Sequence, residues 1–249
     1  MSRIVILGVP VDPLTRGEAV ARLQSMLSSA GQHHVMTPNS EMLVAASHDE
    51  AFRSVLQKSD LNIADSQGLV WMSRLIGQSL PERVTGVDTV TDLCASLSKD
   101  HPVFLLGAAP GIAEKTADVL RVRNPHLTIV GTFAGSPKEN DAMEIIRRIA
   151  DAKPHLLLVA YGAPAQDLWI HEHLAKLPSV RVAMGVGGTF DFIAGTQIRA
   201  PKMLQSLGLE WLWRLMREPR RFTRILNAVV VFPWLAFRYR SGLPRAEVR

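Results

Sequence analysis

The chain has 249 residues, 47% of them hydrophobic, so it is long enough to bury a large core, and this composition argues against global disorder. Its formal net charge of +5 is uneven: residues 205–249 hold nine arginines and three acidic residues, net +6, which leaves net −1 for residues 1–204. A near-neutral body with a cationic C-terminal segment predicts an anionic partner: a membrane surface, nucleic acid or a phosphorylated substrate.

The sequence contains few features that indicate the cellular compartment of the protein. Cys94 is the single cysteine and can form no intramolecular disulfide, which indicates a reducing compartment such as the cytosol. The N-terminus lacks the apolar core of a signal peptide. The longest apolar stretch, residues 225–237, is shorter than the roughly 20 residues that span a bilayer, so we expect it to lie in an interface rather than cross one.

Short β-branched runs alternate with helix-period segments along most of the chain. The runs lie at residues 3–9, 33–37, 61–65, 102–107, 127–133, 155–161 and 181–187. Helical patterns follow, for example at residues 15–27, which open on a capping box of Thr15 and Glu18. Because the runs are almost continuously apolar, they are typical of parallel strands covered on both faces. We therefore predict an α/β fold: a Rossmann-like parallel sheet sandwiched by helices.

The pattern changes near residue 196. Residues 196–249 read as a helical appendage, basic and aromatic, interrupted by Gly208 and Pro219, and residues 1–195 read as the α/β core. Arginines 214, 217, 221 and 224 are spaced by three or four and share one face of a helix. Interleaved Trp and Phe residues indicate that this face packs or enters an interface rather than facing only solvent.

Polar and glycine-rich stretches follow the predicted strands, where ligands of parallel sheets bind. They contain Thr37 and Asn39, Asp65, GAAPG at 107–111, GAPAQD at 162–167 and GVGGTFD at 185–191. Any single glycine turn is usually turn geometry, but together they predict a nucleotide or diphosphate ligand. Asp65 either caps the following helix or acts as a base. Histidines 33, 34, 171 and 173 have no partners at a diagnostic spacing and are interpreted as structural.

Several familiar motifs are missing from the sequence. GAAPG lacks the G-x-G-x-x-G spacing of dinucleotide sites, and no Walker lysine occurs. The sequence contains no D-x-D pair, H-E-x-x-H motif or Cys/His cluster, so it does not predict a dedicated metal site. Without a divalent cation, a departing nucleoside diphosphate would need arginines and helix N-termini to meet its charge.

Five stretches carry a family resemblance: residues 37–46, 63–71, 82–88, 162–170 and 185–224. In order and spacing they resemble the WecG/TagA/CpsF family of bacterial glycosyltransferases, from about residue 4 to about residue 226. The resemblance implies an inverting, metal-independent transferase without a cofactor. It would move an N-acetylmannosamine-type or related sugar from a UDP-sugar to a polyprenyl-diphosphate-linked saccharide in surface polysaccharide synthesis. The enzyme would be peripheral on the inner face of the cytoplasmic membrane, and self-association into a homo-oligomer is compatible with the family.

The resemblance also assigns site residues. Asp65 would be the general base that deprotonates the acceptor hydroxyl. The pocket would be lined by Thr37, Asn39, Arg83 and Gln166. The nucleotide would be bound by Asp191 and by the turn with Gly185, Gly187 and Gly188. The diphosphate would be held by Arg214, Arg221 and Arg224. The aromatic residues and the apolar run after residue 225 would rest on the membrane. Two positions depart from the family pattern: Ser66 replaces a glycine and Asp167 a glutamate.

Two other classes of protein fit part of the sequence. An NAD(P)-dependent oxidoreductase would explain the α/β body but gives the arginine-rich appendage no role. A non-catalytic membrane-surface binding module would explain the appendage but not the polar residues at strand ends. Few lysines and no nucleic-acid-reading motif argue against a nucleic-acid partner.

Overall fold

A computed structural model describes residues 2–239, the side chains of Lys202, Ser206 and Arg221 excepted. Its central element is a six-stranded sheet with the strand order β4-β3-β8-β7-β5-β6, in which every pairing is parallel. The strands are β3 (His33–Met36), β4 (Leu61–Asn62), β5 (Val103–Gly107), β6 (Ile129–Phe133), β7 (Leu156–Ala160) and β8 (Val182–Gly185). The predicted parallel α/β sheet is confirmed.

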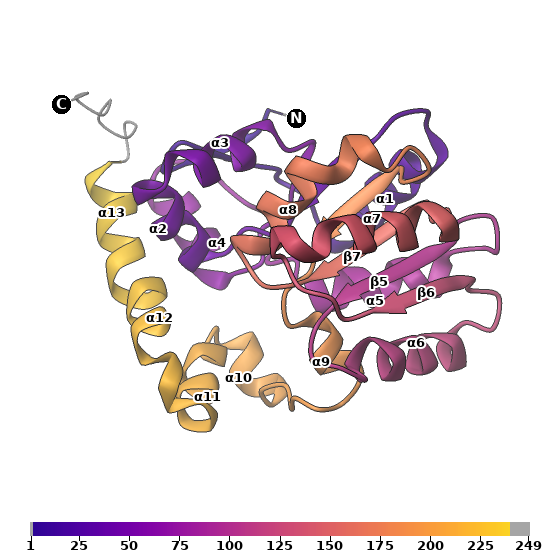
Figure 1. The fold of residues 1–249 in the computed structure, drawn as a ribbon. Coiled ribbons are helices and arrows are strands. Elements are labelled where there is room, and N and C mark those ends of the chain that lie inside the picture. Colours follow the sequence, from indigo (N-terminus) through magenta and orange to yellow (C-terminus); the bar gives the residue numbers. More distant parts are fainter. Residues whose placement is uncertain (1, 240–249) are drawn as a thin grey trace.

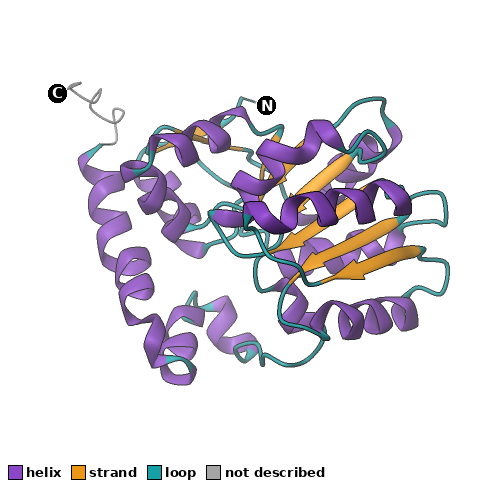
Figure 2. Cartoon of the chain, viewed as in Figure 1, coloured by secondary structure: helices purple, strands orange, loops and turns teal. Residues whose placement is uncertain are grey.

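Helices cover both faces of this sheet (Figures 1 and 2). One face packs against α1 (Arg16–Ser28), α5 (Gly86–Ser96), α6 (Ile112–Arg123) and α9 (Thr189–Ile193). The other packs against α7 (Glu139–Ala152) and α8 (Ala165–His173), which continues into η1 (Leu174–Lys176). Strand β7 shows why the strands are apolar throughout: Leu156 and Leu158 enter one core cluster, while Leu157 and Val159 enter the other.

A third core cluster lies beside the sheet. It joins β1 (Ile4–Ile6) and β2 (Val9–Val11) to α2 (Ser40–His48), α3 (Glu50–Lys58) and α4 (Gln67–Leu75). The run at residues 3–9 was predicted to belong to the parallel sheet, and this is wrong: β1 and β2 form a separate antiparallel pair. Leu7 and Gly8 both have positive φ, 49° and 75°, the backbone geometry of a two-residue hairpin turn, and they reverse the chain after three residues.

The appendage is a chain of short helices. They are α10 (Lys202–Ser206), α11 (Glu210–Arg217), η2 (Pro219–Arg221), α12 (Phe222–Leu226), the π-helical turn η3 (Asn227–Val231) and α13 (Phe232–Arg238). They run along one side of the molecule and bring α13 beside α2 (Figure 1). Gly208, at φ 70°, separates α10 from α11, and Pro219 opens η2, so the predicted interruptions occur at these residues.

The end of the appendage packs onto the body. Phe232, Leu235 and Ala236 are buried in the cluster that α2 and α4 also form. The division at residues 195 and 196 stays a prediction, but the last described helix shares a core with the N-terminal region. Among residues 2–239, no helix is both long and apolar enough to cross a membrane.

Candidate active site

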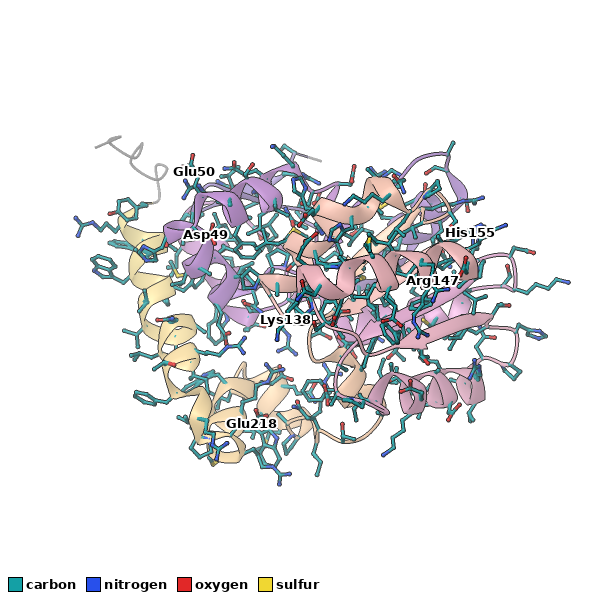
Figure 3. All side chains as sticks on the ribbon, in the orientation of Figure 1. Asp49, Glu50, Lys138, Arg147, His155 and Glu218 are labelled. Atoms are coloured by element: carbon teal, nitrogen blue, oxygen red, sulfur yellow. The ribbon has the colours of Figure 1, made fainter. Side chains whose placement is uncertain are left out.

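A cavity of about 520 Å³ separates the body from the appendage. The body contributes Asn39 and Asp65, from the segments after β3 and β4, and Arg83 from the loop before α5. The appendage contributes residues of α11 and also Glu218, which follows that helix. Figure 3 labels Glu218 in the appendage. Residues far apart in sequence therefore meet at the carboxyl ends of β3 and β4, where ligands of parallel sheets bind.

Asp65 presents a carboxylate to this cavity. The helix that follows is capped by Ser66, whose side chain accepts a hydrogen bond from the Leu69 N–H, so Asp65 is not needed as the cap. Burial raises the pKa of Asp65 to about 7, although Arg214, Arg83 and the Gly86 N–H all lower it. A carboxyl group that titrates near neutral pH can accept a proton from a substrate hydroxyl at working pH.

Two arginines, one from the body and one from the appendage, act on this carboxylate. Arg83 Nη1 donates to Glu210 Oε2 at 2.5 Å, an ion pair that links the body to the first residue of α11. Arg214, one turn further along α11, also lines the cavity, and its guanidinium lies 5.4 Å from the centroid of the Phe192 ring. The cavity wall also contains Glu41, Glu210 and Glu218. It therefore offers arginines that can meet an anionic group, together with Asp65, the carboxylate whose pKa is raised to about 7. This combination suits a substrate with both an anionic group and a hydroxyl group.

A second ion pair anchors the start of the appendage. Arg199 lines the cavity and donates to both carboxylate oxygens of Asp88 on α5, at 2.7 and 3.0 Å. Burial alone would raise the pKa of Asp88, but hydrogen bonds from Arg199 and Thr85 bring it down to about 2. This pair therefore stays charged and holds the segment between α9 and α10 against the body.

Behind the cavity, Gln166 joins two of the glycine turns. Its Oε1 accepts hydrogen bonds from the N–H of Gly162 at 3.0 Å and of Gly187 at 2.9 Å, which ties the turn after β7 to the turn after β8. Gly185 leaves no room for a side chain, because a Cβ there would lie 2.3 Å from Asp167 Oδ1. Gln166 and Gly185 therefore fix the backbone of these turns, Gln166 by its hydrogen bonds and Gly185 by its lack of a side chain.

The other predicted site residues are placed as follows. Thr37 donates to the Gly185 carbonyl at 3.2 Å, and Asn39 lines the cavity while its side chain caps α2. Asp191 accepts from Thr196 and closes the turn after α9. Arg224 pairs with Glu41 at 2.7 Å, and the Arg221 side chain lies outside the described part of the chain.

Of the twelve predicted site residues, the cavity wall contains four. They are Asn39, Asp65, Arg83 and Arg214. Those described but not in this wall are Thr37, Gln166, Gly185, Gly187, Gly188, Asp191 and Arg224. Most of these lie at the ends of β3, β7 and β8, so the structure separates a charged cavity under the appendage from a glycine-rich edge of the sheet.

Sequence reasoning missed several lining residues. Arg199 and Glu210 have just been described, and Trp71, Trp211 and Trp213 add aromatic surface to the wall. Spacing could have found Glu210, because residues 210 and 214 are one helical turn apart and face the same side of α11. Arg199 stands in a loop, and no sequence signal identifies its partner on α5.

Metal-ligating side chains come together elsewhere. Among the described residues, Glu139, Glu172 and His173 place ligand atoms within 4.8 Å of one another. None of the three lines the cavity, and the Lys176 ammonium lies 3.2 Å from His173 Nδ1, where it would repel a cation. This cluster is therefore not part of the candidate active site.

The fold and the cavity define an α/β enzyme with a candidate base among arginines. Comparison with known proteins gives the class: residues 4–246 match the model of the glycosyl transferase WecG/TagA/CpsF family. The chain belongs to this family and is a glycosyltransferase.

Two relatives illustrate the match. A protein of Bacillus spizizenii strain W23 is 34% identical over 78% of this chain and 74% of its own length. One of Staphylococcus aureus strain MRSA252 is 26% identical over 99% of this chain and 96% of its own length. Both are named N-acetylglucosaminyldiphosphoundecaprenol N-acetyl-beta-D-mannosaminyltransferase. The family assignment excludes the two alternative functions, an NAD(P)-dependent oxidoreductase and a non-catalytic membrane-surface binding module.

Proposed function

We propose that this glycosyltransferase moves an N-acetylmannosamine-type sugar from a UDP-sugar to N-acetylglucosamine on a polyprenyl diphosphate. The names of the relatives support the transferred sugar and the lipid-linked acceptor. The reaction would supply a lipid-linked disaccharide for a bacterial surface polysaccharide. The observation that carries the proposal is the half-buried Asp65 with a pKa near 7 in a cavity that Arg83 and Arg214 also line.

The proposed chemistry is a single displacement. Asp65 accepts the proton of the acceptor hydroxyl as its oxygen attacks the anomeric carbon, and the bond from that carbon to the UDP oxygen breaks. Attack from the side opposite the leaving group inverts the anomeric centre. The charge that develops on UDP is met by Arg214 and Arg83, with Arg224 and Arg221 as further candidates, and no metal ion or cofactor takes part.

The appendage would also bring the enzyme to its acceptor. Its outer side chains include exposed Phe222, Val230 and Trp234, among arginines. Basic helices with exposed apolar side chains bind the surface of anionic bilayers. We propose that the enzyme sits peripherally on the inner face of the cytoplasmic membrane, where UDP-sugars are available.

The experiment is calorimetric titration of UDP with EDTA present and NADH as comparator. We expect UDP to bind wild type without metal, and Arg214→Ala to weaken binding about tenfold, as for the loss of one charge-assisted contact. Arg147→Ala, on α7 and paired with Asp151, is the matched control and should bind like wild type. Failure of UDP to bind wild type, or equal weakening in both variants, contradicts the proposal.

A further inference from the structure

The Glu210 carboxylate pairs with Arg83, an arginine that an incoming anion would need as its own partner. The Arg83–Glu210 pair crosses from body to appendage, and its side chains are only 14% and 21% exposed. Both residues line the same cavity as Asp65. Because the pair is partly buried, salt and water screen it less than a surface pair.

The neighbouring arginines have other contacts. Arg199 is held by both oxygens of Asp88, and Arg214 stacks on Phe192, where its charge stays available. Arg217 also lines the cavity, with its guanidinium 5.9 Å from the centroid of the Trp213 ring. Among the ion pairs of the described side chains, Arg83–Glu210 is one in which both the arginine and the carboxylate line the cavity. A diphosphate that enters the cavity meets repulsion from Glu210 and attraction from Arg83, so it binds best where it replaces Glu210 on that guanidinium.

The helix to which Glu210 belongs makes this exchange feasible. Glu210 is the first residue of α11, and Leu209 before it provides no side-chain cap. The N-terminus of a helix carries partial positive charge and stabilises a nearby carboxylate. Glu210 therefore remains favourably placed after Arg83 turns to another anion.

We propose that Glu210 is a resident counter-ion of Arg83 that the diphosphate of the substrate displaces, which makes Glu210 a positioning residue for the reaction. The inference rests on the proposed function, because that function supplies the diphosphate. The inference has a structural consequence. When the diphosphate is bound, the Arg83–Glu210 contact between body and appendage is lost, so substrate binding is coupled to the packing of α11 against the body.

The test is a double-mutant cycle with calorimetric titration of UDP and, separately, of inorganic pyrophosphate. Glu210→Gln keeps the shape and an oxygen that accepts from Arg83 but removes the charge. We expect it to bind both probes about threefold to fivefold more tightly than wild type, the scale of one screened ion pair. In an Arg83→Gln background the same change should tighten binding clearly less than in wild type, because it then removes only the repulsion between Glu210 and the diphosphate and releases no guanidinium.

Asp92→Asn is the charge-matched control, since Asp92 pairs with Arg16 on the body and does not line the cavity. Unchanged or weaker binding by Glu210→Gln, or equal tightening in Asp92→Asn, overturns the inference. UDP could fail to bind wild type while pyrophosphate binds, and binds more tightly to Glu210→Gln in a way that depends on Arg83. In that case the counter-ion role stands and the assignment of UDP-sugar as the donor fails.

A pH profile gives a readout that a purely structural role would not move. The charged groups that act on Asp65 are Arg83 before α5, Arg214 and Glu210 on α11, and Arg199 in the loop before α10. Glu210 raises the pKa of Asp65, so Glu210→Gln should move the acidic limb of kcat/KM to lower pH. An unmoved limb contradicts the assignment.

Discussion

At the scale of single residues, Asp65 has the environment expected of a general base. Its carboxylate has lost much of its hydration, and this effect outweighs the pull of two arginines and a backbone N–H on its pKa. The neighbouring Ser66, where the family pattern has glycine, supplies the helix cap through its hydroxyl. The departure at this position therefore has a structural role, and the Asp65 carboxylate is not needed to cap the helix.

We expect Asp65→Asn to lower turnover by about 10²–10⁴-fold, the usual contribution of a positioned base, while UDP binding is retained. The wild-type enzyme should lose kcat/KM as pH falls through about 7, because the raised pKa leaves the carboxyl group protonated below that value. Steady-state kinetics across the pH range measure both effects. Asp118→Asn, an exposed change on α6, is the control, and full turnover by Asp65→Asn would remove Asp65 as the base.

At the scale of elements, helix α13 ties the appendage to the N-terminal region. Phe232 is fully buried, and its ring lies 3.7 Å from the position of a Cβ at Gly68 on α4. Pro233 follows, and because proline has no N–H to donate, the π-helical turn η3 precedes it. The helix is thus held by packing rather than by regular hydrogen bonding alone.

Phe232→Ala should lower the free energy of unfolding by about 3–5 kcal/mol, the usual loss for a buried aromatic side chain. Urea denaturation measures it. Val230→Ala, two residues earlier and exposed, should change stability by less than about 0.5 kcal/mol. Equal effects of the two substitutions would mean that α13 does not pack as described.

At the scale of the whole molecule, exposed apolar side chains gather on the appendage. Val230 and Trp234 are each 56% exposed, and they lie between Arg224 on α12 and Arg238 on α13. Figure 3 shows side chains projecting outward from this part of the chain, on the opposite side of the molecule from His155, which directly precedes β7. The arrangement combines apolar insertion with attraction to anionic headgroups.

We expect the protein to bind vesicles containing anionic lipids, less strongly at high salt, and the double change Val230→Ser, Trp234→Ser to weaken binding severalfold. Vesicle sedimentation measures the bound fraction. Met143→Ser is the matched control, since Met143 is 84% exposed but lies on α7, in the body. Equal loss in the control would place the membrane contact elsewhere.

Much of this protein is determined by local sequence. Apolar runs such as residues 155–161 specify buried parallel strands because both faces of the strand need apolar side chains, and Thr15 with Glu18 forms the predicted capping box. Asp65 could be identified because it ends such a run. Gly208 and Pro219 interrupt the appendage for reasons that lie in their own backbones.

Only the tertiary structure decided which of these pieces meet. The hairpin of β1 and β2 leaves the parallel sheet because it pairs within itself, and Glu210 reaches Arg83 across 127 residues of sequence. Local patterns specify strands, helices and turns through short-range sterics and hydrogen bonds. Contacts between body and appendage depend instead on how distant surfaces pack, so the partners of Arg83 and Arg199 and the raised pKa of Asp65 emerge only in the folded chain.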